Sequence, residues 1–173
     1  MIIKVIDMEL KQLSINDGMD IYEMLQRIGA EENAFHNDVN GMTFEEYKQW
    51  LVKQESWAKG DSLPEGYVRQ WTYWLYDNNM PVGYGKLREK LTDSSREFGG
   101  NIGYAIDSER RGKGYGSLLF SSLLDKAREL GIKEIMSTVE KNNIASKIIQ
   151  EKCGGVLIKE NEDRWYFSFD SNL

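Results

Sequence analysis

Cysteine, histidine and proline are scarce in this sequence of 173 residues, which contains one cysteine (Cys153), one histidine (His36) and two prolines. A single cysteine cannot form an internal disulfide, and Cys153 and His36 are too far apart in sequence to give the Cys/His spacing of a zinc site. We therefore expect no bound metal. The two residues would act as a nucleophilic pair only if the fold happened to bring them together.

Long apolar runs are absent as well. Residues 1–14 are interrupted by Lys4, Asp7, Glu9 and Lys11, so they lack the hydrophobic core that a signal peptide or a membrane span needs. The sequence therefore predicts a cytoplasmic protein with no membrane partner.

The sequence has no surplus of basic residues. Lys and Arg number 22 against 28 Asp and Glu, which gives a net charge of -6 without a long basic stripe, so nucleic-acid binding is disfavoured. A hydrophobic fraction of 40% and a charged fraction of 29% are typical of a globular protein. The length is that of one folded unit, and we expect a single domain over residues 1–173.

Hydrophobic periodicity and turn residues predict a mixed α+β chain. The predicted strands cover residues 4–14, 67–77, 82–88, 101–107, 132–139, 156–159 and 164–169. The predicted helices cover residues 17–28, 43–58, 114–130 and 143–152. We expect the strands at 101–107 and 132–139 to lie parallel and adjacent, because a helix connects them.

The richest local signal is the basic, glycine-rich run Arg110-Arg111-Gly112-Lys113-Gly114-Tyr115-Gly116-Ser117, which precedes the Leu-rich helix. Alternating glycines let the backbone approach a ligand, and the N–H groups of a helix start favour a phosphate. The spacing matches neither a Walker A loop nor a dinucleotide fingerprint. An ordinary glycine-rich turn with solvated charges is the alternative.

Two segments resemble a known family. Ile102-Gly103-Tyr104-Ala105-Ile106 followed by Arg111-x-x-Gly114-x-Gly116 resembles the acetyl-coenzyme A signature of the GNAT superfamily of N-acetyltransferases, and Asn143-Ile144-Ala145-Ser146 with Glu151-Lys152-Cys153-Gly154-Gly155 resembles its second signature. Upstream segments are similar to a bacterial subgroup of predicted acetyltransferases. The resemblance implies a GNAT-like fold: a mixed, mostly antiparallel central sheet of six to seven strands, helices on both faces, and a parallel strand-helix-strand unit that binds the coenzyme.

The resemblance also implies acetyl-coenzyme A as cosubstrate and assigns residues to it. The backbone N–H of Ile106 would point at the thioester carbonyl and polarise it. The residues expected to contact the coenzyme are Tyr104, Ile106, Arg111, Gly112, Lys113, Gly114, Tyr115, Gly116, Asn143 and Ser146. For Asn143, an ordinary helix N-cap is the alternative.

The sequence departs from the family where many members carry a catalytic tyrosine, because Gln150 stands there and cannot donate an acidic proton. Tyr104 or Ser146 is the replacement candidate, or water protonates the thiolate. Candidates for the base are Glu140 and Glu97, with a water chain as the default.

The acceptor site should involve the first two predicted helices, the loop at residues 31–41 and the predicted strand at residues 67–77, which is rich in aromatic residues. Glu32 and Asp38, with Glu31, and the aromatic residues Trp74 and Tyr76 would suit a cationic amine. Alternatively, the aromatics are core and the acids are solvated.

These observations predict transfer of an acetyl group to a primary amine of a small molecule or peptide, by direct attack in a ternary complex. A coenzyme A-binding sensor without turnover is one alternative, and a phosphate-binding or interaction domain with a fortuitous loop is another. Assembly as a homodimer is left open.

Overall fold

The computed structural model describes residues 7–172, which form five α-helices, a short 3₁₀ turn and nine strands. The strands are β1 (Met8–Gln12), β2 (Glu31–Glu32), β3 (Phe35–His36), β4 (Gln70–Asp77), β5 (Met80–Arg88), β6 (Ile102–Ile106), β7 (Ile135–Glu140), β8 (Val156–Glu160) and β9 (Arg164–Phe169). The helices are α1 (Met19–Arg27), α2 (Phe44–Lys59), α3 (Asp93–Glu97), α4 (Tyr115–Glu129) and α5 (Ile144–Lys152).

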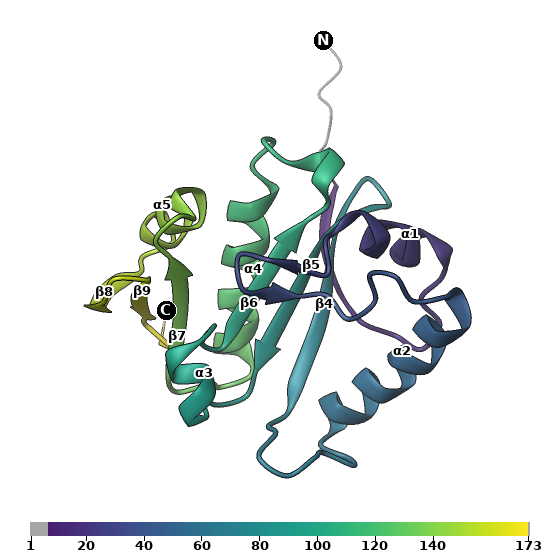
Figure 1. The fold of residues 1–173 in the computed structure, drawn as a ribbon, viewed down its shortest axis with the longest axis horizontal. Helices are drawn as coiled ribbons and strands as arrows, with labels where there is room; N and C mark the ends of the chain where they lie inside the picture. The colour runs from purple at the N-terminus through teal and green to yellow at the C-terminus, as the bar shows by residue number, and fades with distance from the viewer. Residues whose placement is uncertain (1–6, 173) are drawn as a thin grey trace.

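The central sheet is antiparallel, with strand order β1-β4-β5-β6 (Figure 1). The strands predicted at residues 67–77 and 82–88 are observed as the antiparallel hairpin of β4 and β5. Its turn residues Asn78 and Asn79 have φ values of 47° and 66°, the left-handed conformations that asparagine tolerates and that a tight hairpin turn needs. The predicted first strand is observed as β1, while its residues 4–6 lie outside the described residues.

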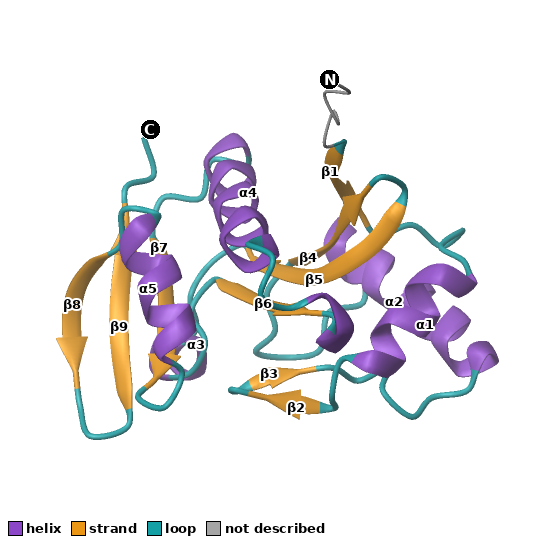
Figure 2. Cartoon of the chain, turned by 90° about the horizontal axis from the view of Figure 1, so that it is seen from above, coloured by secondary structure: helices purple, strands orange, loops and turns teal. Residues whose placement is uncertain are grey.

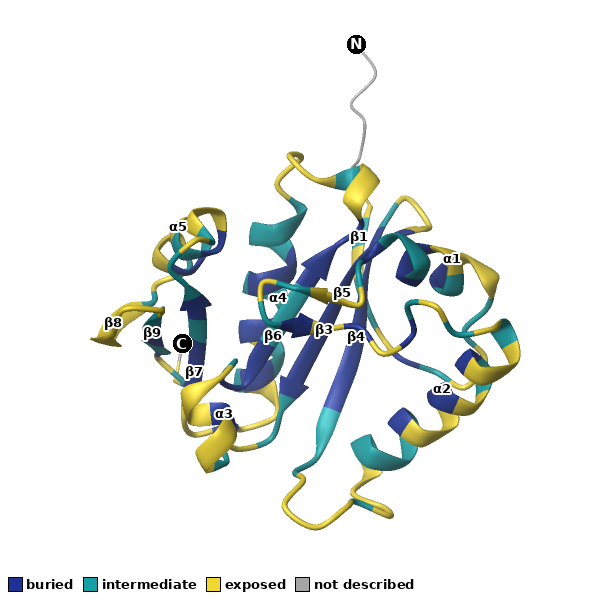
Figure 3. Cartoon of the chain, viewed as in Figure 1, coloured by how far each residue is buried: buried dark blue, intermediate teal, exposed yellow. Residues whose placement is uncertain are grey.

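Helices cover both faces of this sheet, as predicted. Helix α4 lies on one face, while α1 and α2 lie on the other (Figure 2). Close packing of α4 depends on glycines in β5: a Cβ at Gly83 or Gly85 would lie within 3 Å of Leu119 or Leu123. The two faces bury two core clusters, and the central strands β4 and β5 between them are almost entirely buried (Figure 3).

The strands on either side of α4, β6 and β7, are neighbours as predicted, but they do not form a hydrogen-bonded parallel pair. Strand β7 belongs to a second sheet of order β7-β9-β8, and β6 is an edge of the first sheet. The two edges meet at a single bridge between Gly100 and Ser137. There the backbones come so close that a Cβ on Gly100, at φ 71°, would lie 2.2 Å from the Met136 carbonyl oxygen. Apart from the β2–β3 hairpin, the strands are thus divided between a four-stranded and a three-stranded sheet. A cleft lies between β6 and β7, where the two sheets diverge.

Three elements were not predicted: the β2–β3 hairpin, α3 and the 3₁₀ turn at Ser108–Arg110. Each is too short to show a periodicity, and the hairpin has only two residues per strand. The hairpin crosses the face of the central sheet near β6, where the Phe35 ring packs against Tyr84 and lies over Gly103. In the described part of the chain, no helix combines the length and apolarity needed to cross a membrane.

Candidate active site

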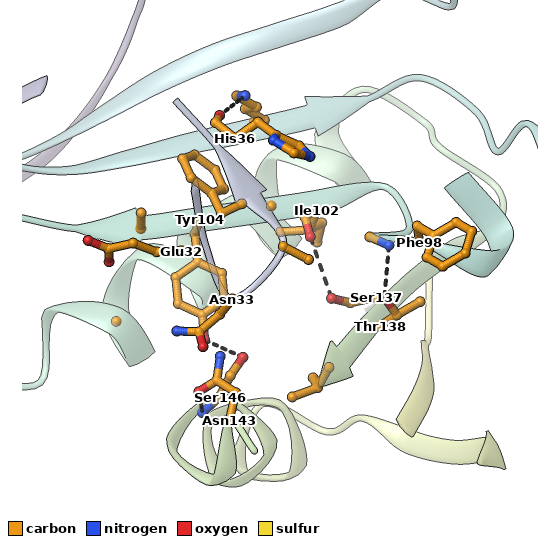
Figure 4. A pocket seen from close by; sticks show the side chains of 18 of the residues that line it. Glu32, Asn33, His36, Phe98, Ile102, Tyr104, Ser137, Thr138, Asn143 and Ser146 are labelled. Carbon is orange, nitrogen blue, oxygen red and sulfur yellow. Dashed lines mark hydrogen bonds between the residues drawn. The ribbon is translucent and has the colours of Figure 1, made fainter. Parts of the chain in front are cut away.

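A cleft of about 1480 Å³ runs along the free edge of β6. The β2–β3 hairpin borders it on one side and β7 with α5 on the other (Figure 4). The glycine-rich loop lines one end of it. Pockets for one small ligand usually measure ~300–1,000 Å³. The cleft is therefore large enough for two molecules side by side.

The glycine-rich loop and the start of α4 present a row of free N–H groups. Within residues 7–172, the N–H groups from Gly112 to Ser117 have no hydrogen-bond partner, and the first bond of the helix runs from Leu118 N–H to the Gly114 carbonyl. Gly112 and Gly114 have φ values of 76° and 84°. The row of N–H groups and the positive end of the helix dipole make an anion site.

An ion pair between the half-buried Arg27 and the buried Asp107 holds this loop against the rest of the fold. Asp107, at the end of β6, is fully buried and accepts from Arg27 of α1 at 2.8 Å, and its other oxygen accepts from the Glu109 N–H at 3.0 Å. The Arg111 guanidinium pairs with Glu32 of the hairpin and also donates to the Ile106 carbonyl at 3.2 Å. The basic loop is thereby attached to both α1 and the hairpin.

The free edge of β6 offers backbone groups in the middle of the cleft. The Asp107 N–H bonds the Val82 carbonyl and the Arg88 N–H bonds the Asn101 carbonyl, so odd-numbered residues of β6 face β5. Antiparallel ladders alternate, and the N–H and C=O groups of residues 102, 104 and 106 therefore point to the free edge. The Ile106 N–H is directed there, as the family resemblance requires.

A hydrogen-bond network crosses the cleft from β6 to α5. The hydroxyl groups of Tyr104 and Ser146 are 2.8 Å apart (Figure 4). Gln150 Nε2 donates to Ser137 Oγ at 3.0 Å and lies 3.5 Å from Ser146 Oγ. Burial raises the pKa of Tyr104 to about 12, against a smaller lowering by the bond with Ser146. Tyr104 therefore holds its proton at neutral pH.

The residues present fit a coenzyme A thioester on three counts. The free N–H groups and Arg111 suit its pyrophosphate, and the open edge of β6 suits an extended amide-containing arm. Gln150 Oε1 is buried on the lining of the cleft without a partner among the described residues, so it can accept a hydrogen bond from a bound molecule.

Most residues predicted for the coenzyme line this cleft, but Lys113 does not. The Lys113 side chain is exposed, which leaves only its N–H facing the site. Asn143 lines the cleft and also caps α5, since its Oδ1 accepts from the Ser146 N–H at 3.2 Å. The capping alternative is therefore correct for its side-chain oxygen.

The two candidate bases lie in different places. Glu140 lines the cleft, but its carboxylate accepts from Arg164 at 3.1 Å. Glu97 is not on the lining: its side chain is exposed and lies 3.4 Å from Lys159. The structure thus does not bring Glu97 to the site, because α3 turns its last residue toward β8 and β9.

The prediction that Trp74 and Tyr76 bind the acceptor is wrong. Both are buried in the core under α1 and α2, where the Trp74 N–H donates to Asp17 at 2.7 Å and the Tyr76 hydroxyl lies 3.4 Å from Asp20. The core alternative applies to them. Glu32 and Asp38 do line the cleft, although Glu32 forms an ion pair with Arg111 of the glycine-rich loop.

Sequence reasoning missed Lys86 and Arg88 of β5, which line the cleft at the end far from the glycine-rich loop. A signal was present for Lys86, which follows the run Val82-Gly83-Tyr84-Gly85 and precedes Leu87 in a strand that is otherwise apolar. A charged residue in such a strand is buried with it. Ser137 and Thr138 of β7 also line the cleft, and no local pattern marks them.

Comparisons with known proteins agree with this geometry. The family model for the acetyltransferase (GNAT) domain matches residues 8–156. Similar solved structures include the ribosomal-protein-S5-alanine acetyltransferase from Vibrio fischeri, with a TM-score of 0.71 and 18% identity over 95% of this chain and 93% of that chain. The ribosomal L7/L12 alpha-N-protein acetyltransferase RimL in complex with coenzyme A has a TM-score of 0.67 and 14% identity over 94% of this chain and 93% of that chain. YncA from Salmonella typhimurium, a putative acetyltransferase with its cofactor acetyl-CoA, has a TM-score of 0.62 and 17% identity over 95% of this chain and 94% of that chain. No curated protein sequence gives a significant match.

Proposed function

The chain belongs to the GNAT acetyltransferase family of acyl-coenzyme A-dependent N-acyltransferases, and we propose that it transfers the acetyl group of acetyl-coenzyme A to a primary amine by direct attack in a ternary complex. The observation that carries this proposal is the continuity of one cleft. The free N–H groups from Gly112 to Ser117 lie at one end, the open edge of β6 lies in the middle, and a second polar region lies at the other end.

In this proposal, the loop from Arg111 to Gly116 binds the pyrophosphate through N–H groups and the Arg111 guanidinium. The β6 edge holds the arm, and Asn143 and Ser146 approach it from α5. The Ile106 N–H donates to the acyl oxygen, where a fixed donor lowers the barrier of acyl transfer. When bound, acetyl-coenzyme A supplies an activated thioester, so no covalent intermediate on the protein is required.

Tyr104 is the proposed acid that protonates the departing thiolate. Its hydroxyl is held by Ser146 at 2.8 Å and retains its proton up to high pH, because burial raises its pKa to about 12. Ser146 orients this hydroxyl and is itself positioned by Gln150. The amine reaches the site neutral by losing its proton to water in the cleft, since Glu140 is bound by Arg164.

The test combines a binding measurement with a turnover measurement. Acetyl-coenzyme A should raise the melting temperature, because a ligand that binds only the folded state stabilises it. Incubation with primary amines and peptides should then release free thiol and yield acetylated acceptor detected by mass spectrometry. The absence of any melting shift at millimolar coenzyme would contradict the proposal.

Gln150 in place of an acidic tyrosine favours one other function, a coenzyme A sensor without turnover. A sensor would show the melting shift but no thiol release with any acceptor, and the Tyr104→Phe variant would then behave like the parent protein. Turnover that depends on the Tyr104 hydroxyl excludes the sensor.

A further inference from the structure

Two basic side chains, Lys86 and Arg88, line the cleft at the end far from the glycine-rich loop. They are two residues apart on β5 and so project from the same face of the strand. Lys86 pairs in register with Gly103, and the Arg88 N–H bonds the Asn101 carbonyl. Both cations therefore lie beside the first half of β6, whereas the proposed pyrophosphate loop follows its last residue.

No acid neutralises either cation at short range. Lys86 Nζ donates to the His36 carbonyl, and Arg88 Nη1 donates to the Gly100 carbonyl at 3.0 Å. Both acceptors are uncharged, and within residues 7–172 neither side chain forms an ion pair or another hydrogen bond. Asp38, which is exposed, acts on Lys86 only through its more distant charge.

The fold pays a free-energy penalty for these charges. The Lys86 residue is only 9% exposed, and burial, together with the positive charge of Arg88, lowers its pKa to about 8 against the opposing effect of Asp38. Burial also lowers the pKa of Arg88. Two like charges without a counter-ion, held side by side on the lining of a cleft, are the arrangement expected of an anion-binding site.

We propose that the acceptor carries an oxyanion, a carboxylate or phosphate, in addition to its amine, and that this group binds between Lys86 and Arg88. The inference rests on the proposed function and specifies its substrate class. Lys86 has two N–H bonds left after His36, and the Arg88 guanidinium offers a planar fork that matches two oxygens.

The position of the pair suits such an acceptor. Gly103, beside Lys86, is three residues from Ile106, or about 10 Å along an extended strand. An amine at the Ile106 end and an oxyanion at Lys86 would therefore be separated by a short chain of carbon atoms. The two positive charges also disfavour the protonated amine, which must lose a proton before it attacks.

Matched pairs of acceptors test the inference. Straight-chain ω-amino acids of increasing length are compared with their carboxamides, and ω-aminoalkyl phosphates with the corresponding amino alcohols. The members of each pair differ in the oxyanion, so the first series tests carboxylate and the second tests phosphate. Spermidine serves as an acceptor with positive charge only. Thiol release gives kcat and KM, and the melting temperature in the presence of coenzyme A gives acceptor binding independently of turnover.

We expect at least one anionic acceptor to be turned over more efficiently than its neutral partner and than spermidine. Lys86→Met and Arg88→Met should each raise KM for that acceptor by about 10- to 100-fold, the effect of losing one hydrogen bond between charged groups. Each variant should affect the neutral partner much less than the anionic acceptor, and the affinity for acetyl-coenzyme A should stay unchanged. Arg88→Lys should retain part of the effect, and Lys90→Met, an exposed lysine off the cleft lining, should retain the parent kinetics.

Two results would overturn the inference while leaving the proposed function intact. One is equal kcat/KM for the anionic and the neutral member of every pair. The other is an equal loss of kcat/KM for both members in the variants, which would indicate that Lys86 and Arg88 have a purely structural role. If acetyl-coenzyme A binds but no acceptor is turned over, the melting temperature provides the test. A rise in melting temperature caused by the anionic acceptor, and lost in Lys86→Met, supports the site, and the absence of such a rise refutes it. Failure of acetyl-coenzyme A to bind would instead refute the proposed function and the premise of the site with it.

Discussion

The two ends of the cleft differ in how their positive charges are balanced. At the coenzyme end, Arg111 is paired with Glu32, and free N–H groups of the backbone supply much of the positive potential. At the proposed acceptor end, Lys86 and Arg88 form no ion pair within residues 7–172: each donates to a neutral carbonyl, and Lys86 also lies over the Phe35 and Tyr84 rings. The coenzyme end relies on dipoles that substitution of a side chain cannot remove, while the acceptor end relies on two side chains.

This difference separates what is common to the reaction from what selects the acceptor. Backbone N–H groups at a helix start recognise any phosphate and carry little further information. Buried charged side chains impose a strong preference, because a partner that fails to match them leaves a charge unpaired. We therefore expect substitutions at the two ends to affect different kinetic constants.

The largest effect should come from Gly114→Glu, which places a carboxylate at the anion site. Repulsion between unit charges 4 Å apart is about 4 kcal/mol near a protein surface, so acetyl-coenzyme A affinity should fall more than about 100-fold in a titration. Gly131→Glu is a matched control at the opposite end of α4, because Gly131 also has a left-handed φ, 71°, and open space around it. Equal losses in the two variants would mean that backbone strain, and not charge, is responsible.

Tyr104→Phe should lower kcat by about 100-fold, the low end of the range for losing a general acid, while acetyl-coenzyme A affinity is retained. The phenyl ring preserves the packing against Phe120, so the change isolates the hydroxyl. Steady-state kinetics beside a coenzyme titration provide the measurement. An unchanged kcat would show that water protonates the thiolate.

Lys86→Met should make the free protein more stable, by about 2 kcal/mol at pH 7. A pKa lowered from 10.5 to about 8 corresponds to about 3 kcal/mol, and the lost bond to His36 offsets roughly 1 kcal/mol. Denaturant unfolding measures the change. A less stable variant would show that Lys86 stabilises the fold. It would also weaken the contrast in charge balance between the two ends of the cleft.

The pH dependence of stability has a defined sign for this residue. Because the pKa of Lys86 is lower in the folded state, the unfolded chain binds more protons between pH 8 and 10.5, and Lys86 makes stability rise with pH across that window. The groups that act on it are Asp38, which opposes the shift, and Arg88, which adds to it. The difference in unfolding free energy between Lys86→Met and the parent protein should therefore shrink over this window.

Glu32→Gln should strengthen acetyl-coenzyme A binding two- to fivefold, roughly the value of an exposed ion pair, because it frees Arg111 and removes a negative charge near the pyrophosphate. Glu31→Gln is the control, since Glu31 lies on the same hairpin and has no ion pair among the described residues. Weaker binding in Glu32→Gln would show that Glu32 instead positions Arg111 for the coenzyme.

The smallest effect should come from Tyr76→Phe, which removes a hydroxyl that lies 3.4 Å from Asp20 in the core. Acceptor KM should stay unchanged, and the free energy of unfolding should fall by at most about 1 kcal/mol. A raised KM for the acceptor would show that Tyr76 contributes to acceptor binding after all.

Much of the coenzyme end could be predicted because its determinants are local in sequence. The glycine spacing, the start of α4 and the capping residue Asn143 act within a few residues of themselves. The acceptor end could not be predicted in the same way. Trp74 and Tyr76 are core residues because α1 and α2 cover them, and Lys86 reaches the cleft under a hairpin 50 residues earlier in the chain.

The sequence by itself determined the order of the longer helices and strands, the glycine-rich loop and the family, since hydrophobic period, glycine conformation and helix capping are short-range properties. Only the tertiary structure decided that β6 and β7 part into two sheets, that Glu32 pairs with Arg111, and that Lys86 and Arg88 are buried without an acid. Burial and charge pairing depend on which distant segments meet, and the same side chain is costly or harmless according to that environment.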